Sequence, residues 1–92
     1  MKEVNIIDIE RVALEFLLAA RKNAGMTETE LGEKAFPDAS NPRAKVHAMW
    51  SAKTAENKGL RLRLGDFCAM CLALDKNPAQ ELLLLWNKVE QA

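Results

Sequence analysis

The stretch Arg21–Leu31, R-K-N-A-G-M-T-E-T-E-L, marks the end of one helix and the start of the next. The two basic residues that open it suit the negative end of a helix dipole, and Gly25 supplies the residue that commonly stops a helix. Thr27 then starts a new helix, because Glu30 stands three residues on and completes a capping box with it. The stretch therefore predicts two consecutive helices joined by a tight turn, as at the opening of a helix-turn-helix.

A long amphipathic helix is expected before this turn, over about 5–24. Its apolar side chains recur at three- and four-residue steps; they are Ile6, Ile9, Ala13, Phe16, Leu17, Ala20 and Ala24. A second apolar ridge is formed by Ile7, Leu14 and Leu18. Together they give this helix more apolar surface than a lone surface helix needs.

Three further helices are expected downstream of the one that Thr27 starts. Asn41-Pro42 and Asn77-Pro78 each pair a capping residue with a proline at the first helical position, which predicts helices over about 41–52 and 77–89. Another apolar segment predicts a helix over about 62–74, and no good strand is present. We therefore expect an all-α chain of five helices. Its 92 residues suit one domain, 1–92, with the helix-turn-helix over about 27–52.

The composition excludes several classes of function. No apolar run reaches the roughly 20 residues that cross a bilayer, and no secretory signal is visible, so a cytoplasmic protein is expected. A single histidine leaves no catalytic trio, and neither a phosphate loop nor a metal cluster is evident. We expect no enzyme, no cofactor and no metal. Cys68 and Cys71 form a C-A-M-C run on the apolar side of their helix, which favours core residues over a redox pair or a zinc site.

The charge of the chain is strongly polarised. Residues 41–65 hold six basic residues and a single acidic one, a net charge of +5, whereas the rest of the chain carries −5. Positive charge gathered in one stretch is an electrostatic footprint for nucleic acid.

The third helix lies inside this basic stretch. At about 100° per residue, its core face holds Val46, Met49 and Trp50. The opposite face holds Ala44, His47, Ala48 and Ser51, and it is flanked on its two sides by Arg43 and Lys45. Small residues between basic edges let a helix sit deep in a major groove, where Arg and Lys reach phosphates or guanine. A solvated helix with incidental charge is the alternative that the residues leave open.

The order of these features resembles the Cro/repressor-type helix-turn-helix family, also known as the XRE or lambda-repressor-like class. The residues that carry the resemblance are Arg21, Gly25, Met26, Thr27, Glu30, Leu31, Val46, Met49, Phe67, Met70, Ala73, Leu74, Pro78 and Leu82. The resemblance implies a five-helix domain whose third helix enters the major groove of DNA. Two departures from the family are a longer turn between the second and third helices and Glu28 at a position where glutamine is common. A carboxylate cannot donate to a phosphate and would repel it.

The resemblance and the charge together give a set of candidate DNA contacts. Arg43, Ala44 and Ala48 match the base-facing positions of the family, and Thr27, Lys45, His47 and Ser51 fall at or near its other contact positions. The remaining basic residues of the stretch complete the set: Lys53, Lys58, Arg61 and Arg63. The implied function is that of a sequence-specific transcriptional regulator of the phage-repressor type. The alternative is a protein-interaction module, such as an antitoxin or a phage accessory factor, that retains the fold.

The fifth helix carries more leucine than one core contact needs. Leu83 lies at the margin of its core face and Leu84 nearly opposite that face. Leftover apolar surface often marks a partner site. We therefore expect a homodimer through this helix, with the ridge of Ile7, Leu14 and Leu18 as a possible extension of the interface. A larger core that covers these side chains is the alternative.

Overall fold

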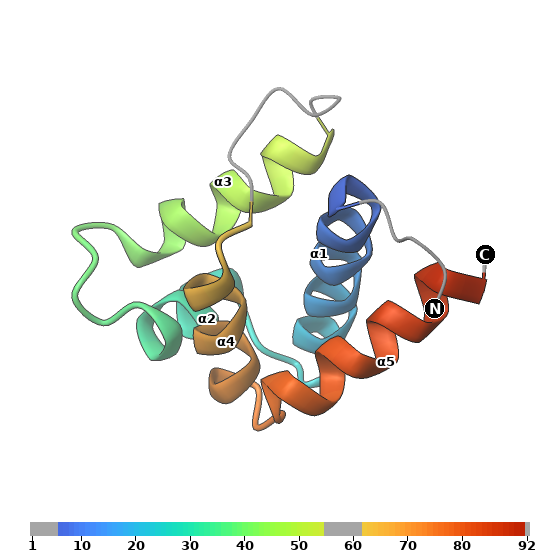
Figure 1. The fold of residues 1–92 in the computed structure, drawn as a ribbon. Helices are drawn as coiled ribbons and strands as arrows, with labels where there is room; N and C mark the ends of the chain where they lie inside the picture. Colours follow the sequence, from blue (N-terminus) through green and yellow to red (C-terminus); the bar gives the residue numbers. More distant parts are fainter. Residues whose placement is uncertain (1–5, 55–61, 92) are drawn as a thin grey trace.

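The computed structural model describes residues 6–54 and 62–91, and within them the chain is entirely helical. The five helices are α1 (Ile6–Asn23), α2 (Glu28–Ala35), α3 (Pro42–Thr54), α4 (Leu64–Ala73) and α5 (Pro78–Gln91). Helix α2 packs against α3 and α4, and α5 packs along α1 (Figure 1). The described residues form no strand. The predicted all-α class with five helices is therefore confirmed, and no described helix is long and apolar enough to span a membrane.

The predicted helix starts are confirmed by side-chain caps. The Thr27 hydroxyl oxygen accepts a hydrogen bond from the Glu30 backbone N–H, and the Glu30 carboxylate accepts one from the Thr27 N–H, each at 3.1 Å. The Asn41 side-chain oxygen accepts a hydrogen bond from the Ala44 N–H at 3.1 Å. Asn77 caps α5 in the same way through the N–H groups of the second and third helical residues. These caps satisfy N–H groups that a helix start leaves unpaired.

The ends of α1 and α4 share one geometry. Gly25 has a φ of 67°, and the chain returns through a hydrogen bond from the Met26 N–H to the Arg21 carbonyl. At the end of α4, Asp75 has a φ of 61° and the Lys76 N–H donates to the Cys71 carbonyl. Both are Schellman motifs, which favour glycine at the left-handed position. An aspartate is tolerated there, since its short polar side chain makes it one of the few other residues found with positive φ. The end of α4 is therefore not marked by a glycine in the sequence.

Three helix boundaries lie two residues from those expected, and one of them is the end of α5, at Gln91 rather than near Val89. Helix α4 starts at Leu64 rather than near Leu62, because Arg63 has extended dihedral angles (φ −80°, ψ 146°) and occupies the N-cap position. Helix α3 runs to Thr54, past the expected end near Ala52.

The core joins four helices around side chains that expose none of their surface. They are Leu17 of α1, Leu31 of α2, Val46 of α3, and Met70 and Cys71 of α4. Helix α5 adds Leu85, and Trp50 packs partly buried against the cluster. Leu14 is only 5% exposed and belongs to this core. The expectation that Leu14 extends a dimer surface is therefore wrong, because the core takes up Leu14 together with Ala13 and Leu17.

Candidate nucleic-acid interface

The close packing of α2 against the start of α3 depends on a glycine in the middle of α2. Gly32 is buried, and a Cβ atom built on it would lie 2.6 Å from the Pro42 carbonyl oxygen at the start of α3. Only a residue without a side chain lets the two backbones approach this closely. The sequence signal was present, since glycine inside a short helix is unfavourable and normally has a packing reason.

The outer face of α3 is the one that the sequence predicted. Val46 and Met49 are buried on the inner side, at 0% and 5% exposure. Arg43, Ala44, His47 and Ser51 are exposed on the other side, and Ala48 is half-buried. Within the described part of the chain, the Arg43 guanidinium has no hydrogen-bond or ion-pair partner. Of the α3 cations whose side chains the structure describes, Arg43 is thus the one that is available to a ligand.

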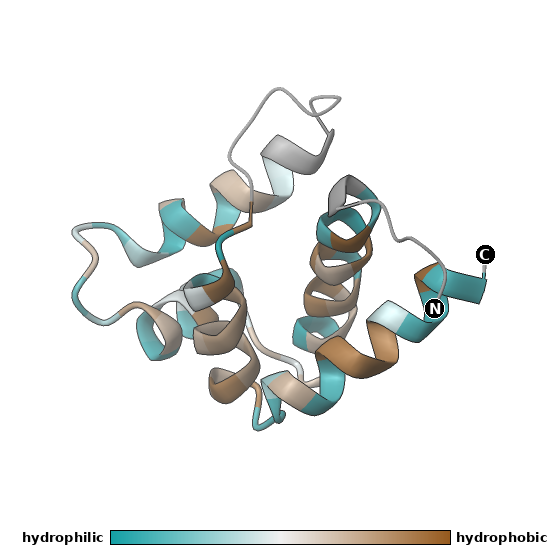
Figure 2. Ribbon diagram, in the orientation of Figure 1, coloured by the Kyte–Doolittle hydropathy of each residue, from teal (hydrophilic) through white to brown (hydrophobic). Residues whose placement is uncertain are grey.

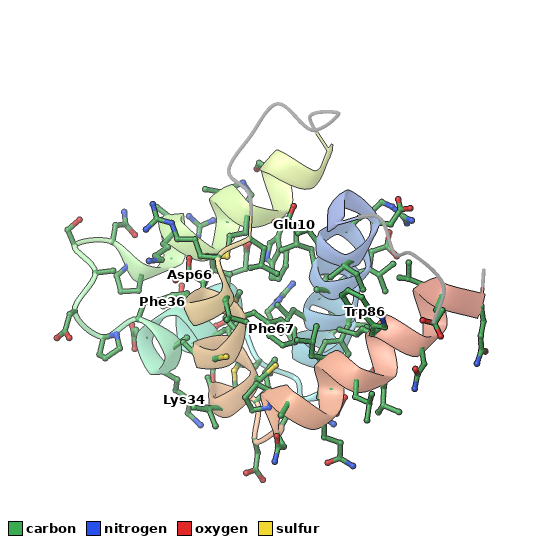
Figure 3. The ribbon with its side chains drawn as sticks, in the orientation of Figure 1. Glu10, Lys34, Phe36, Asp66, Phe67 and Trp86 are labelled. Carbon is green, nitrogen blue, oxygen red and sulfur yellow. The ribbon has the colours of Figure 1, made fainter. Side chains whose placement is uncertain are left out.

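Lys45 is bound within the fold. Its Nζ lies 3.5 Å from a carboxylate oxygen of Asp66 and 4.4 Å from the centre of the Phe36 ring (Figure 3). The Asp66 side chain is only 19% exposed, so the pair lies at the edge of the core rather than on the open surface. A cation over an aromatic ring and next to a carboxylate has two attractive partners already. Lys45 therefore joins α3 to α4, a role that the sequence did not indicate.

His47 also has a partner from another helix. Its Nδ1 lies 3.2 Å from a carboxylate oxygen of Glu28, at the start of α2. The carboxylate that the sequence marked as unfavourable for DNA is thus held against the exposed face of α3. Glu28 stands 19 residues before His47, so no local pattern could have paired them.

Thr27 has a structural role that the structure makes explicit. Its hydroxyl oxygen is occupied by the cap of α2. The hydrogen bonds from Thr27, the backbone one first, lower the pKa of the Glu30 carboxyl, because they favour its charged form. The Thr27 hydroxyl keeps its own hydrogen as a donor, so a phosphate contact is compatible with the cap.

Of the other predicted cations, the structure describes the side chain of Arg63 alone. Arg63 is exposed at the N-cap of α4 and makes no side-chain capping bond. Lys53 belongs to α3, but its side chain lies outside what the structure describes. Lys58 and Arg61 fall outside the described residues. The structure thus brings six of the predicted residues together on α3, namely Arg43, Ala44, Lys45, His47, Ala48 and Ser51. It places Arg63 at the start of α4.

Leu83 and Leu84 of α5 are exposed, at 61% and 57%. This confirms that the core does not cover them. The exposed Gln80 and Asn87 flank both leucines on the helix surface, so the two do not form a continuous apolar row. Their role in a dimer stays a prediction.

The two cysteines differ in their environment. Cys71 exposes none of its surface, as predicted, whereas Cys68 is half-buried. Burial, followed by the proximity of Cys68 and Glu81, raises the pKa of the Cys71 thiol to about 11. Among the described residues, no three His, Cys, Asp or Glu side chains are grouped closely enough to hold a metal ion.

The α2–α3 pair is therefore a capped unit with one open face. On this face Arg43, which has no partner among the described residues, stands beside small side chains, while Lys45 and His47 each lie next to a carboxylate. Comparison of the chain with protein-family models, with curated proteins and with solved structures found no match.

Proposed function

We propose that this chain is a DNA-binding transcriptional regulator that places α3 in the major groove. The proposal includes a lambda-repressor-like helix-turn-helix formed by α2 and α3. The observation that supports it best is the outer face of α3. There Arg43 is exposed, has no partner among the described residues, and lies next to the small side chains of Ala44 and Ala48. An arginine of this kind suits guanine or phosphate, and alanine suits close approach and thymine methyl groups.

The affinity of such a complex would come mainly from phosphate contacts. Binding should therefore weaken steeply with salt, with the logarithm of the association constant falling by about 0.9 per phosphate neutralised for each tenfold rise in salt. Because palindromic sites suit two-fold proteins, the proposed regulator acts as a homodimer.

Fluorescence anisotropy of a labelled mixed-sequence duplex, titrated at low and moderate salt, tests this proposal. Replacing Arg43 by alanine should cost about 1–3 kcal/mol of binding free energy if the side chain reads a guanine. Lys88→Ala is the matched control, because it removes one positive charge from an exposed position of α5, away from α3. Equal affinities of the two variants, or no binding at low salt, would count against α3 as the DNA-contacting element.

A protein-interaction module is the second candidate, and one observation favours it. His47 lies 3.2 Å from Glu28, and Lys45 lies 3.5 Å from Asp66. Two of the side chains on α3 that could contact a phosphate therefore already have carboxylate partners. In that case α3 would contact a protein and not a phosphate backbone. Loss of amide exchange on α3 in the presence of a partner protein, together with none in the presence of DNA, would identify this function.

A further inference from the structure

Helix α4 has an apolar outer face in addition to its buried inner one. Phe67, Met70 and Cys71 point into the core, while Leu64 and Leu72 are 70% and 67% exposed. The single carboxylate of the helix, Asp66, is engaged by Lys45. Most of α4 is coloured toward the hydrophobic end of the scale in Figure 2. A helix that is apolar all round is normally covered on all sides, and this outer face has no such cover among the described residues.

The outer face consists of a ridge and a groove. Residues four apart form rows along a helix, and one such row is Leu64, Cys68 and Leu72. The neighbouring row is Gly65, Ala69 and Ala73, in which no side chain is larger than a methyl group. This second row opens into a shallow pocket of about 540 Å³, which is also lined by Lys34, Ala35 and Pro37 at the end of α2 and just beyond it.

We propose that two copies of this chain associate through α4, with the two helices antiparallel and the ridge of each copy in the groove of the other. A two-fold axis between Cys68 and Ala69 places each large side chain of one copy over a small one of the other. Leu64 then meets the partner's Ala73, and Leu72 meets the partner's Gly65. Interdigitation of such rows from both helices is the commonest helix-packing class in globular proteins.

The charges at the two ends of α4 fit the same arrangement. Arg63 is exposed immediately before the helix, and Asp75 is exposed two residues after it. Antiparallel pairing places each Arg63 next to the partner's Asp75, so the same ion pair forms at both ends of the interface. A parallel arrangement would instead bring two arginines together at one end. The surface is thus self-complementary in charge as well as in shape, which identifies a second copy as its occupant.

The leucines of α5 offer a poorer surface for this purpose. Leu83 and Leu84 are flanked on the helix by the exposed polar side chains of Gln80 and Asn87, and no row of small residues lies beside them. They would have to be buried together with amide groups that need hydrogen-bond partners. Helix α4 presents no such groups on its outer face.

Sedimentation equilibrium of the full chain tests the proposal without DNA, so its outcome is independent of the proposed function. The parent chain should dimerise, and Leu72→Glu should raise the dissociation constant at least tenfold. Leu84→Glu distinguishes this surface from the one expected on α5, because it places the same charge on an exposed leucine of that helix. If the copies meet through α4, it should leave the dissociation constant unchanged. A monomer at all concentrations up to the millimolar range would overturn the proposal, and so would a dimer that Leu84→Glu disrupts and Leu72→Glu does not.

A second variant separates association from folding. A Cβ atom at Gly65 would meet nothing within 4 Å, so Gly65→Gln fits the isolated chain and should raise its melting temperature. The same side chain fills the groove, and it should raise the dissociation constant of the dimer at least tenfold. A Gly65→Gln chain that folds and dimerises like the parent would contradict the ridge-in-groove packing.

Cysteine cross-linking locates the two-fold axis. Cys68 lies beside the axis, whereas Cys71 is fully buried. Oxidation by copper–phenanthroline needs no room for a linker, so it should join the two Cys68 thiols in a disulfide and give a covalent dimer of the parent chain and of Leu84→Glu. Cys68→Ser is the control without an accessible thiol and should give none. A parent chain that dimerises in the centrifuge but resists this cross-link would overturn the placement of the axis.

Discussion

Gly32 shows how a single residue positions the candidate interface. Its absent side chain leaves room for the Pro42 carbonyl, which a Cβ atom would approach to 2.6 Å. Backbone atoms of α3 cannot move aside without displacing the helix. Gly32→Ala should therefore lower the free energy of unfolding by about 1–3 kcal/mol, the usual cost of overpacking. Urea denaturation followed by circular dichroism measures this change.

The matched control is a glycine with open space around it. Gly65→Ala should raise the free energy of unfolding by roughly 0.5–1 kcal/mol, because alanine favours a helix and nothing lies within 4 Å of the new atom. Opposite signs for the two variants would attribute the cost at Gly32 to the contact between α2 and α3. A similar loss in both would mean that the contact is not the cause.

The two thiols give a second prediction at the scale of residues. Burial raises the pKa of Cys71 from 9.0 to about 11, so its reactive thiolate is suppressed. At pH 8 a thiol reagent should modify one cysteine of the folded chain, Cys68, and both after unfolding. Because the folded-state pKa is raised, the associated stability is present below pH 9 and is lost as the pH rises toward 11. Rapid modification of two thiols in the folded chain would show that Cys71 is accessible.

At the scale of elements, the capping box makes the stability of α2 depend on pH. The Thr27 hydrogen bonds lower the folded-state pKa of Glu30, so the stabilisation is present above its usual value of 4.5 and is lost as the pH falls through the lowered value. Glu30→Gln keeps a hydrogen-bond acceptor but removes this titration. Between pH 5 and pH 3, the parent chain should lose more stability than Glu30→Gln. Parallel stability curves for the two chains would show that the box contributes nothing to the acid dependence.

Capping interactions of this kind lie within one helical turn, and this explains which elements could be predicted from the sequence. Thr27 with Glu30, Asn41 with Pro42 and Asn77 with Pro78 act within one helical turn, so their patterns located three helix starts. The inner and outer faces of α3 also followed from helical periodicity. By contrast, Asp75 ends α4 in a conformation that favours glycine, and it was not recognisable as a stop.

The partners of Lys45 and His47 could not be predicted for a different reason. Asp66 and Glu28 reach them from other helices, so the pairing depends on how α2, α3 and α4 pack and not on any local pattern. Leu14 was misjudged in the same way, because only the packing of α1 against its neighbours shows that this side chain belongs to the core. The sequence thus predicted the residues on the face of α3 but not their charge balance.

At the scale of the whole molecule, the net charge of zero means that attraction to DNA depends on where the charges lie. The positive stretch is offset within the fold, since Glu28 lies 3.2 Å from His47 on the very face that is proposed to enter the groove. A carboxylate at that position opposes the approach of phosphates and removes a donor from His47. Glu28 therefore limits the affinity of the proposed complex.

Glu28→Gln should accordingly strengthen DNA binding by several-fold at low salt, and the gain should shrink as salt screens the lost repulsion. Glu33→Gln is the matched control, because it removes one negative charge from an exposed position of the same helix, away from His47. Anisotropy titrations of both variants at two salt concentrations measure the difference. An equal gain in both would reflect net charge alone, whereas a gain confined to Glu28→Gln would place Glu28 and His47 at the DNA surface. If neither variant altered binding, the face of α3 between Arg43 and His47 would lie away from the DNA, and the regulator would have to use another surface.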